Sequence, residues 1–388
     1  MPINPAIQDL VPDAQQWRRH LHANPELLYD VPRTAAFVAE RLREFGCDEV
    51  RTAVGRTGVV GVIRGRKGQR KRAIGLRADM DALPIEETTN LPYRSTVPGR
   101  MYACGHDGHT AMLLGAARYL ARTRDFSGTA IVIFQPAEEG GGGGKAMIDD
   151  GLMENFAIDE VYAMHNDPKW PIGRFALRKG PMLASADFFT IRLEGKGGHA
   201  AYPHQCVDTI VAGTQIVTEL QTIVSRNVDP LDSCVVSVAR FTAGSNDNVL
   251  PQTAELEGTA RSLLPATRDL TERRVREIVA GIAAASGISA NIDYRRSYPP
   301  TINPPAQTDF AASVARQIVG PERVMTEAPP VMAAEDFSFM LEARPGAFIW
   351  LGNGDSAGLH HPAYDFNDAA LPYGMAYFAG IVETALVP

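Results

Sequence analysis

Short apolar runs that alternate with helical patterns constrain the fold of this chain more than any other feature. Runs with the length of a strand lie at 57–63, 73–76, 129–134, 161–164 and 347–351. Helical patterns precede them at 12–22 and 33–45, and another separates two of them at 110–122. Strands that are buried on both faces read as continuous apolar runs. The alternation therefore predicts an α/β fold, with a mostly parallel sheet covered by helices on both faces.

The middle of the chain has a different order of elements. Strand and helix patterns follow one another there at 187–194, 208–224, 234–241, 253–261, 268–285 and 289–295. This β-α-β-β-α-β order is typical of a ferredoxin-like sandwich. We therefore predict two domains: 1–182 and 297–388 form the α/β domain, and 183–296 forms an inserted α+β domain.

Composition and charge exclude several classes of protein. The 388 residues include 38 Lys and Arg against 45 Asp and Glu, a formal net charge of −7, which argues against nucleic acid as a partner. No apolar run approaches the ~18 residues that span a bilayer, and no pattern of a secretory signal begins the sequence, so we expect no membrane partner. The four cysteines form no disulfide framework. We expect a cytoplasmic protein.

Side chains of metal-ligand type follow the predicted strands and open the helix at 110–122. They are Asp79, Cys104, His106, His109, Glu138, Glu139, His165, His360 and His361. In open α/β sheets ligands bind beyond the carboxyl ends of the strands, so we expect these side chains to gather at one sheet edge. Thiolate, imidazole and carboxylate together suit borderline divalent metals. The sequence therefore predicts a metal site at this edge.

A glycine run at 140–144, followed by Lys145, raises the question of a phosphate-binding loop. Glu139 stands where the first glycine of such a loop belongs, and Ala146 stands where Ser or Thr would bind magnesium. The carboxylates before the run would also repel phosphate. We reject this interpretation.

The chain resembles peptidase family M20, and within it the branch of aminoacylases, hippurate hydrolases and indoleacetyl-amino-acid hydrolases. The segments that carry the resemblance are 18–27, 76–84, 104–109, 135–140, 195–204, 248–251, 334–337 and 359–362. They extend over almost the whole chain. The resemblance implies a zinc-peptidase-like catalytic domain, an inserted ferredoxin-like domain that acts in dimerisation and as a lid, and a homodimer, with a tetramer as the alternative.

The resemblance also implies a ligand set for two divalent metal ions per subunit: Cys104, His106, Glu139, His165 and His360. Cys104 stands where sister families have a bridging aspartate, and His361 is the other candidate for the last position. Sister families have His-x-Asp where this chain has Arg77-Ala78-Asp79, so His106 would replace the missing ligand. The donor types favour zinc but also admit manganese, cobalt or nickel.

Further roles follow from the same resemblance. Glu138 would be the catalytic general base and acid. His199 would donate a hydrogen bond to the oxyanion in the other subunit's active site, Asn248 would act similarly, and Arg261 would bind the substrate carboxylate. The remaining residues are expected to orient the ligands rather than bind metal: Asp79, Asp107, His109 and Asp336.

The activity implied is metal-dependent hydrolysis of the amide bond in small-molecule N-acyl-L-amino acids, with hippurate-like, N-acetyl or indoleacetyl acyl groups. Alternatives in the same family are a dipeptidase and an N-acetyl-diaminopimelate deacetylase. A different class is a hydrolase with Cys104 as nucleophile and His106 or His109 as base. A third class is a dimeric binding protein without activity, which would be expected to have lost Glu138 or several ligands.

Overall fold

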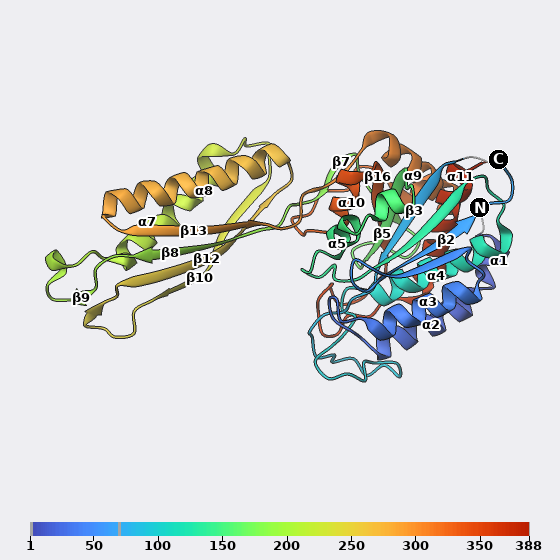
Figure 1. The fold of residues 1–388 in the computed structure, drawn as a ribbon, viewed down its shortest axis with the longest axis horizontal. Coiled ribbons are helices and arrows are strands. Elements are labelled where there is room, and N and C mark those ends of the chain that lie inside the picture. Colours follow the sequence, from blue (N-terminus) through green and yellow to red (C-terminus); the bar gives the residue numbers. More distant parts are fainter. Residues whose placement is uncertain (1–2, 69–70, 388) are drawn as a thin grey trace. The chain divides into compact units, whose positions relative to one another are not determined.

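The chain forms two compact units in the computed structural model, which describes residues 3–68 and 71–387. Unit 1 consists of Met1–Met182, Ile302–Pro329 and Asp336–Pro388. Unit 2 consists of Leu183–Thr301 and Pro330–Glu335. Figure 1 shows how the chain passes through the elements of each unit.

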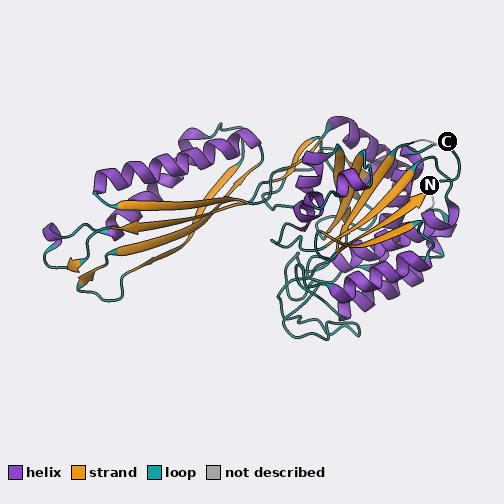
Figure 2. Ribbon diagram, viewed as in Figure 1, coloured by secondary structure: helices purple, strands orange, loops and turns teal. Residues whose placement is uncertain are grey.

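An eight-stranded mixed sheet forms the centre of unit 1 (Figures 1 and 2). Its strands, in spatial order, are β1 (Glu49–Val54), β2 (Gly58–Arg64), β4 (Thr129–Gln135), β3 (Ala73–Asp79), β5 (Glu160–Asp167), β16 (Gly346–Gly352), β6 (Phe175–Ala176) and β15 (Val324–Met325). The α/β prediction is confirmed. The central strands β4, β3, β5 and β16 are parallel neighbours, as predicted. The pairs β1–β2, β2–β4 and β6–β16 are antiparallel. For β1–β2 the reason is the connection at 55–57, which is too short for a parallel crossover.

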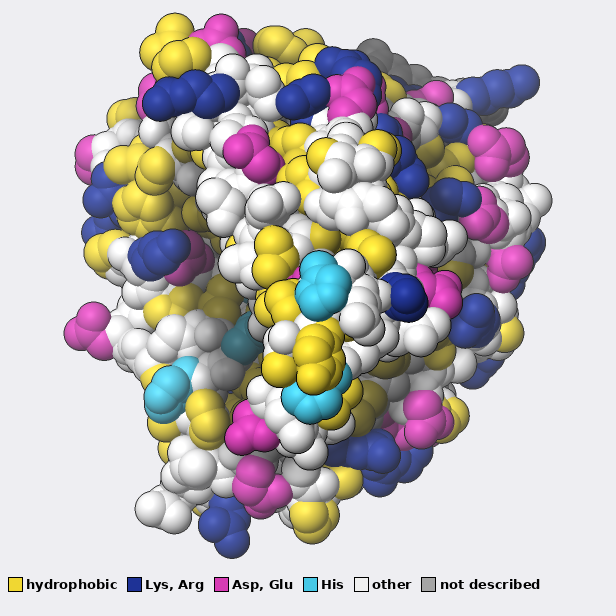
Figure 3. Space-filling model, turned by 90° about the vertical axis from the view of Figure 1, so that its left-hand side faces the viewer, with side chains coloured by type: hydrophobic (Ala, Val, Ile, Leu, Met, Phe, Trp, Pro, Cys, Tyr) yellow, Lys and Arg dark blue, Asp and Glu magenta, His cyan; other side chains and the backbone are white. Residues whose placement is uncertain are grey.

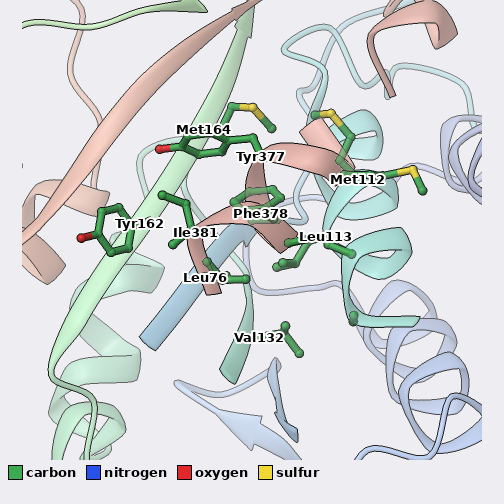
Figure 4. Packing of buried hydrophobic residues seen from close by; sticks show 14 of the residues in the cluster. Leu76, Met112, Leu113, Val132, Tyr162, Met164, Tyr377, Phe378 and Ile381 are labelled. Atoms are coloured by element: carbon green, nitrogen blue, oxygen red, sulfur yellow. The ribbon is translucent and has the colours of Figure 1, made fainter. Parts of the chain in front are cut away.

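Helices cover both faces of this sheet (Figure 2). They are α1 (Pro5–Gln8), α2 (Val11–Ala23), α3 (Pro32–Glu44), α4 (His106–Thr123), α5 (Gly143–Asp149), α6 (Leu152–Asn155), α9 (Pro305–Val319), α10 (Phe337–Ala343) and α11 (Leu371–Ala385). The largest apolar core lies between one face of the sheet and α4, α9 and α11. Figure 4 shows its side chains interlocking, among them Leu76, Met112 and Phe378. This core fixes α4, whose first turn carries candidate ligands.

Unit 2 is an antiparallel four-stranded sheet with two helices on one face. The elements run β8 (Asp187–Glu194), α7 (Thr209–Thr222), β10 (Cys234–Ala243), β12 (Thr253–Ser262), α8 (Pro265–Ser286) and β13 (Ser289–Arg296). The spatial order β10-β12-β8-β13 is that of a ferredoxin-like sandwich. Alternate residues of the strands pack on the helices; Ile191 and Leu256 are fully buried there.

Short paired strands complete the fold. These are β7 (Gly180–Leu183) with β14 (Thr301–Asn303), and β9 (Gly198–His199) with β11 (Val249–Leu250). Among the described residues, no helix combines the length and apolar character that crossing a membrane requires.

Gly346 at the start of β16 permits a close approach to β5. A Cβ at this position would lie 1.8 Å from the carbonyl oxygen of Val161. We predict that Gly346→Ala lowers the free energy of unfolding by about 3 kcal/mol, because the two strands must separate to accept the methyl group. Urea unfolding followed by circular dichroism measures the change. Gly358→Ala is the control, since its Cβ would meet no atom within 4 Å; equal stability of the two variants would contradict the close approach.

Candidate metal centre

The predicted ligands meet at the carboxyl edge of the parallel strands. Asp79 ends β3, Glu138 and Glu139 follow β4, and α4 begins at His106. His165 lies within β5, which continues to Asp167, rather than after the strand as its sequence pattern suggests. Strand ends and a helix start therefore bring together side chains that are far apart in the sequence.

Two groups of donor atoms share the sulfur of Cys104. In the first group, Sγ of Cys104 and imidazole nitrogens of His106 and His165 all lie within 4.8 Å of one another. In the second, Sγ of Cys104, a carboxylate oxygen of Glu139 and a nitrogen of His360 meet the same limit. Glu138, Glu139 and His106 form a further such group. The structure thus assembles two overlapping sets of metal-ligand atoms beside Glu138.

Two buried imidazoles direct Nε2 toward Cys104 and Glu139, and in the neutral ring this nitrogen is unprotonated. Nδ1 of His106 donates to the carbonyl oxygen of Asp81 at 2.8 Å, and Nδ1 of His165 donates to that of Asn166 at 2.7 Å. Since a carbonyl oxygen only accepts, the neutral rings carry their proton on Nδ1 and a lone pair on Nε2. Nε2 of His106 is buried without a hydrogen-bond partner among the described residues. This is the tautomer that a metal-binding imidazole requires.

Charges around the cluster favour a cation. Burial opposes a positive charge on His106, but the carboxylates of Asp79 and Asp81 outweigh this and raise its pKa to about 10. Burial and the carboxylates of Glu139 and Glu138 raise the pKa of the Cys104 thiol well above its usual value. A divalent cation would supply the positive charge that this field attracts and would stabilise the thiolate. The donor set therefore fits metal ions.

The geometry distinguishes His360 from His361. Nε2 of His360 lies 3.3 Å from the carboxylate of Glu139. His360 has φ +64°, and its backbone N–H donates to the carbonyl oxygen of Ala103 at 2.8 Å. Nδ1 of His361 instead accepts the backbone N–H of Ala363 at 3.0 Å. His360 is thus the imidazole directed toward the cluster.

Both ring nitrogens of His109 already have hydrogen-bond partners. Nδ1 lies 2.6 Å from the carboxylate of Asp79, and Nε2 accepts the backbone N–H of Asn166 at 3.0 Å. Burial alone would raise the pKa of Asp79, but His106 and Arg77 hold it well below its usual value. Asp79 and His109 therefore form a charged, hydrogen-bonded layer beneath the donor atoms.

Asp107 lies elsewhere than the sequence suggested. Its carboxylate is 2.8 Å from Nδ1 of His22 and 3.6 Å from the guanidinium of Arg18, both on α2. Burial opposes a charge on His22, yet Asp107 raises its pKa to about 9. Asp107 thus anchors α2 to the start of α4, and the expectation that it orients a predicted ligand is not met by these contacts.

Asp81 is the functional residue to which sequence reasoning gave no role. Its carboxylate accepts the backbone N–H groups of Glu138 at 2.9 Å and Glu139 at 3.1 Å. Its carbonyl oxygen also fixes the His106 ring. The only signal in the sequence is an aspartate two positions after Asp79. One side chain thus positions the carboxylate pair, while its backbone orients an imidazole.

The glycine run lets the chain turn tightly behind this carboxylate pair. A Cβ on Gly143 would lie 1.7 Å from the carbonyl oxygen of Pro136, so no larger residue fits. The backbone N–H of Gly144 donates to the carboxylate of Asp336 at 2.8 Å. Asp336 also accepts from Arg77 at 3.0 Å, so it supports the loop and not a candidate ligand directly. The glycines are therefore explained by the tight turn, which agrees with rejecting a phosphate site.

The other candidate residues lie in unit 2. The exposed His199 of β9 accepts the backbone N–H of Ala201 on Nδ1 at 3.1 Å, which leaves the proton on Nε2. The carbonyl oxygen of Asn248 accepts from Ala200 at 3.0 Å, so Asn248 is next to His199. Figure 3 shows histidine side chains at the surface of this end of unit 2.

Arg261 lies on β12, away from the pair of His199 and Asn248. Its guanidinium stacks over the exposed ring of Phe188 at 5.8 Å. Burial lowers its pKa, and it forms no ion pair with any residue in the described part of the chain. The structure therefore brings His199 and Asn248 together but does not bring Arg261 to them.

Comparisons with known proteins agree with this site. A model of peptidase family M20/M25/M40 matches residues 75–384. The chain is 45% identical to a hippurate hydrolase of Campylobacter jejuni, covering 98% of each chain. It is 38% identical to an N-acetyldiaminopimelate deacetylase of Halalkalibacterium halodurans, covering 95% of this chain and 98% of the relative.

A solved structure leads to the same family. The YXEP protein of Bacillus subtilis, described as a dinuclear metal binding peptidase of family M20, matches with a TM-score of 0.86 and 33% identity over 98% of this chain and 99% of that one. The chain therefore belongs to peptidase family M20/M25/M40 and is a hydrolase.

Proposed function

We propose that the protein is a two-metal-dependent amidohydrolase that splits N-acyl-L-amino acids into a carboxylic acid and an amino acid. The observation that carries this proposal is the pair of donor groups that share Cys104 beside Glu138. The names of two relatives support the substrate class, since a hippurate hydrolase and an N-acetyldiaminopimelate deacetylase both act on an N-acyl bond.

The cluster supports one ligand set for each metal ion. Cys104, His106 and His165 would hold one ion, and Cys104, Glu139 and His360 the other. When bound, such ions polarise a carbonyl group and lower the pKa of water. The mixture of sulfur, nitrogen and oxygen donors suits zinc, manganese, cobalt or nickel.

Glu138 has the position of a general base and acid. Its backbone N–H donates to the carboxylate of Asp81, and the residue is only 7% exposed. The carboxylate would take a proton from the attacking water and then return it to the departing amine. An amide nitrogen leaves as a neutral amine only after it is protonated, so one carboxylate serves both steps in turn.

Unit 2 would supply the remaining contacts with the substrate. His199 offers an Nε2–H that suits an oxyanion, and Asn248 next to it would act similarly. The unpaired guanidinium of Arg261 would bind the carboxylate of the amino acid. These residues would offer hydrogen-bond donors to the substrate, whereas His106 and His165 would offer nitrogen lone pairs to a metal ion.

The distance between these contacts supports a homodimer. Thr253 begins β12, at the end of the strand next to β9, and Arg261 follows eight residues later. At about 3.3 Å per residue, these positions are roughly 26 Å apart. A small substrate cannot span that distance, so His199 and Arg261 of one subunit would serve different active sites. His199 would then act in the partner's site.

Exposed apolar side chains on α7 and β10 would form the surface that meets the second copy. Ile210 and Val211 on α7 are 39% and 54% exposed, and Phe241 on β10 is 38% exposed. β10 is also an edge strand of the sheet in unit 2. Unpaired edge strands readily accept another strand.

We also propose a cytoplasmic location, since all four cysteines are free thiols.

The thiol-nucleophile alternative finds little support in the site. Catalytic cysteines lie in electropositive surroundings that stabilise the thiolate. Glu138 and Glu139 do the reverse here, because they raise the pKa of Cys104. The thiol chemistry of this residue suits a metal ligand better than a nucleophile.

We predict that removal of metal abolishes activity reversibly. Hydrolysis of hippurate, N-acetyl-methionine, indoleacetyl-alanine and a dipeptide should stop after dialysis against EDTA, and it should return when zinc or manganese is restored. The preferred substrate identifies the acyl class and separates the dipeptidase alternative. Activity that persists in protein shown by elemental analysis to be metal-free would exclude the metal mechanism and return attention to Cys104.

We predict different effects for the adjacent carboxylates. Glu138→Gln should lower kcat by about 10²–10⁴-fold, as expected for loss of a general base, with metal content unchanged. Glu139→Gln should lower the metal content as well, because it removes a ligand. Elemental analysis beside steady-state kinetics separates these outcomes. Loss of metal in Glu138→Gln, or full metal content in Glu139→Gln, would reverse the assigned roles.

We predict that His199 acts in the partner's active site. Glu138→Gln and His199→Ala should each be inactive alone. In dimers formed from equal amounts of both, half of the dimers are mixed and each has one intact site, so activity should return to about a quarter of wild type. Tandem affinity tags isolate the mixed dimers. Mixed dimers without activity would show that His199 acts within its own subunit, and an active His199→Ala enzyme would show that His199 has no role.

A further inference from the structure

Leu28 is an exposed leucine in the unit that carries the candidate metal ligands. Its exposed fraction is 41%. Among the described residues of unit 1, the other large apolar side chain exposed to this extent is Val387, next to the C-terminus. Leu28 is therefore the one such side chain within the body of the unit.

The backbone of Leu28 is in an unusual conformation. Its φ is +49°, in the left-handed region that branched side chains rarely adopt. Its carbonyl oxygen accepts the backbone N–H of Ala137 at 3.1 Å, and the N–H of Asp30 donates to Leu27 at 2.8 Å. Both hydrogen bonds use backbone groups alone, so neither involves the side chain at position 28.

The neighbouring side chains all have structural partners. The carboxylate of Glu26 accepts from the backbone of Thr34, and Leu27 packs against a small buried cluster. The hydroxyl of Tyr29 donates to the carbonyl oxygen of Gly141 at 2.9 Å. Leu28 alone in this turn directs an apolar side chain to solvent.

The turn lies directly against the loop that carries Glu138. The residue that bonds to Leu28 is Ala137, which immediately precedes Glu138. On the other side, the N–H of Ala82 donates to the carbonyl oxygen of Glu26 at 2.8 Å, and Ala82 follows Asp81. The backbone of the turn is thus bonded to both segments that position Glu138, and the exposed Leu28 belongs to this turn.

We propose that Leu28 forms an apolar wall of the acyl-binding site and makes the enzyme prefer large apolar acyl groups over acetyl. This inference rests on the proposed function. One end of an N-acyl amino acid carries the carboxylate assigned to Arg261, and the other end is the acyl group. An exposed leucine side chain gains free energy when apolar substrate surface covers it.

Two variants distinguish the effect of the Leu28 side chain from the effect of the turn conformation. Leu28→Ala removes the apolar surface, and Leu28→Asn removes it while retaining a residue that tolerates the left-handed conformation. Leu231→Ala is the matched control, because Leu231 is 97% exposed in unit 2. The substrates are N-acetyl-, N-hexanoyl- and N-benzoylglycine, with the metal-loaded enzyme.

We predict that both Leu28 variants lose about 5- to 10-fold in kcat/KM for the hexanoyl and benzoyl substrates, mainly through KM, with less than about twofold change for acetyl. Leu231→Ala should match wild type throughout. Equal losses for all three acyl groups would show that Leu28 acts only through the turn. Unchanged hexanoyl and benzoyl kinetics in both variants would overturn the inference outright.

A binding measurement distinguishes this inference from the proposed function. Calorimetric titration of the metal-loaded enzyme with acetate, hexanoate and benzoate needs no turnover. The wild type should bind hexanoate and benzoate more tightly than acetate, and Leu28→Asn should lose that difference. If the wild type hydrolyses no N-acylglycine, the proposed function fails, and the titration still decides whether Leu28 contacts an acyl chain. Equal selectivity of wild type and Leu28→Asn would reject that contact.

Discussion

The buried ion pair of Arg77 and Asp79 is the interaction on which the candidate metal centre depends. Arg77 on β3 also donates to Gln135 on β4 and to Asp336 before α10, so one guanidinium ties together two strands and a helix. Asp79 in turn holds His109. Removing one partner of such a buried pair typically costs about 3–5 kcal/mol, because the other charge is left uncompensated. The donor atoms therefore stand on a rigid, charge-balanced base.

Around the donor atoms themselves, the carboxylates of the described residues outnumber the positive charges. This excess of negative charge favours the binding of cations. Carboxylates near Cys104 and His106 raise the pKa of both groups. A site made only for stability would pair these carboxylates with arginine, as β3 does for Asp79. Here the donor atoms instead face one another, and Nε2 of His106 has no hydrogen-bond partner among the described residues. Cations satisfy such a cluster, and the same field raises the pKa of the Cys104 thiol, which disfavours a free thiolate.

Much of the fold and the types of the site residues could be predicted from the sequence, because both depend on local patterns. Apolar runs indicate buried strands, and ligand-type residues at their ends indicate a site at the sheet edge. The contacts of Asp107, Asp81 and Leu28 could not be predicted. Each bonds to a segment far away in the sequence, and no local pattern tells that Asp107 meets α2 or that Leu28 meets Ala137. Only the three-dimensional structure shows that His360 faces Glu139 while His361 bonds to Ala363.

The proposed reaction needs hydrogen-bond donors as well as metal ligands, and under that proposal unit 2 would supply the donors. The edge of the unit 1 sheet is occupied by groups that bind or balance cations, with carboxylates at Asp79, Glu138 and Glu139. An anionic substrate would be repelled by these groups without a compensating positive charge. Arg261 in unit 2 offers such a charge, and His199 offers a neutral N–H. Thr253 and Arg261, at positions eight residues apart on β12, are separated by roughly 26 Å. Under the proposed function, His199 and Arg261 of one subunit would therefore serve different substrates, and catalysis would require the pair of subunits.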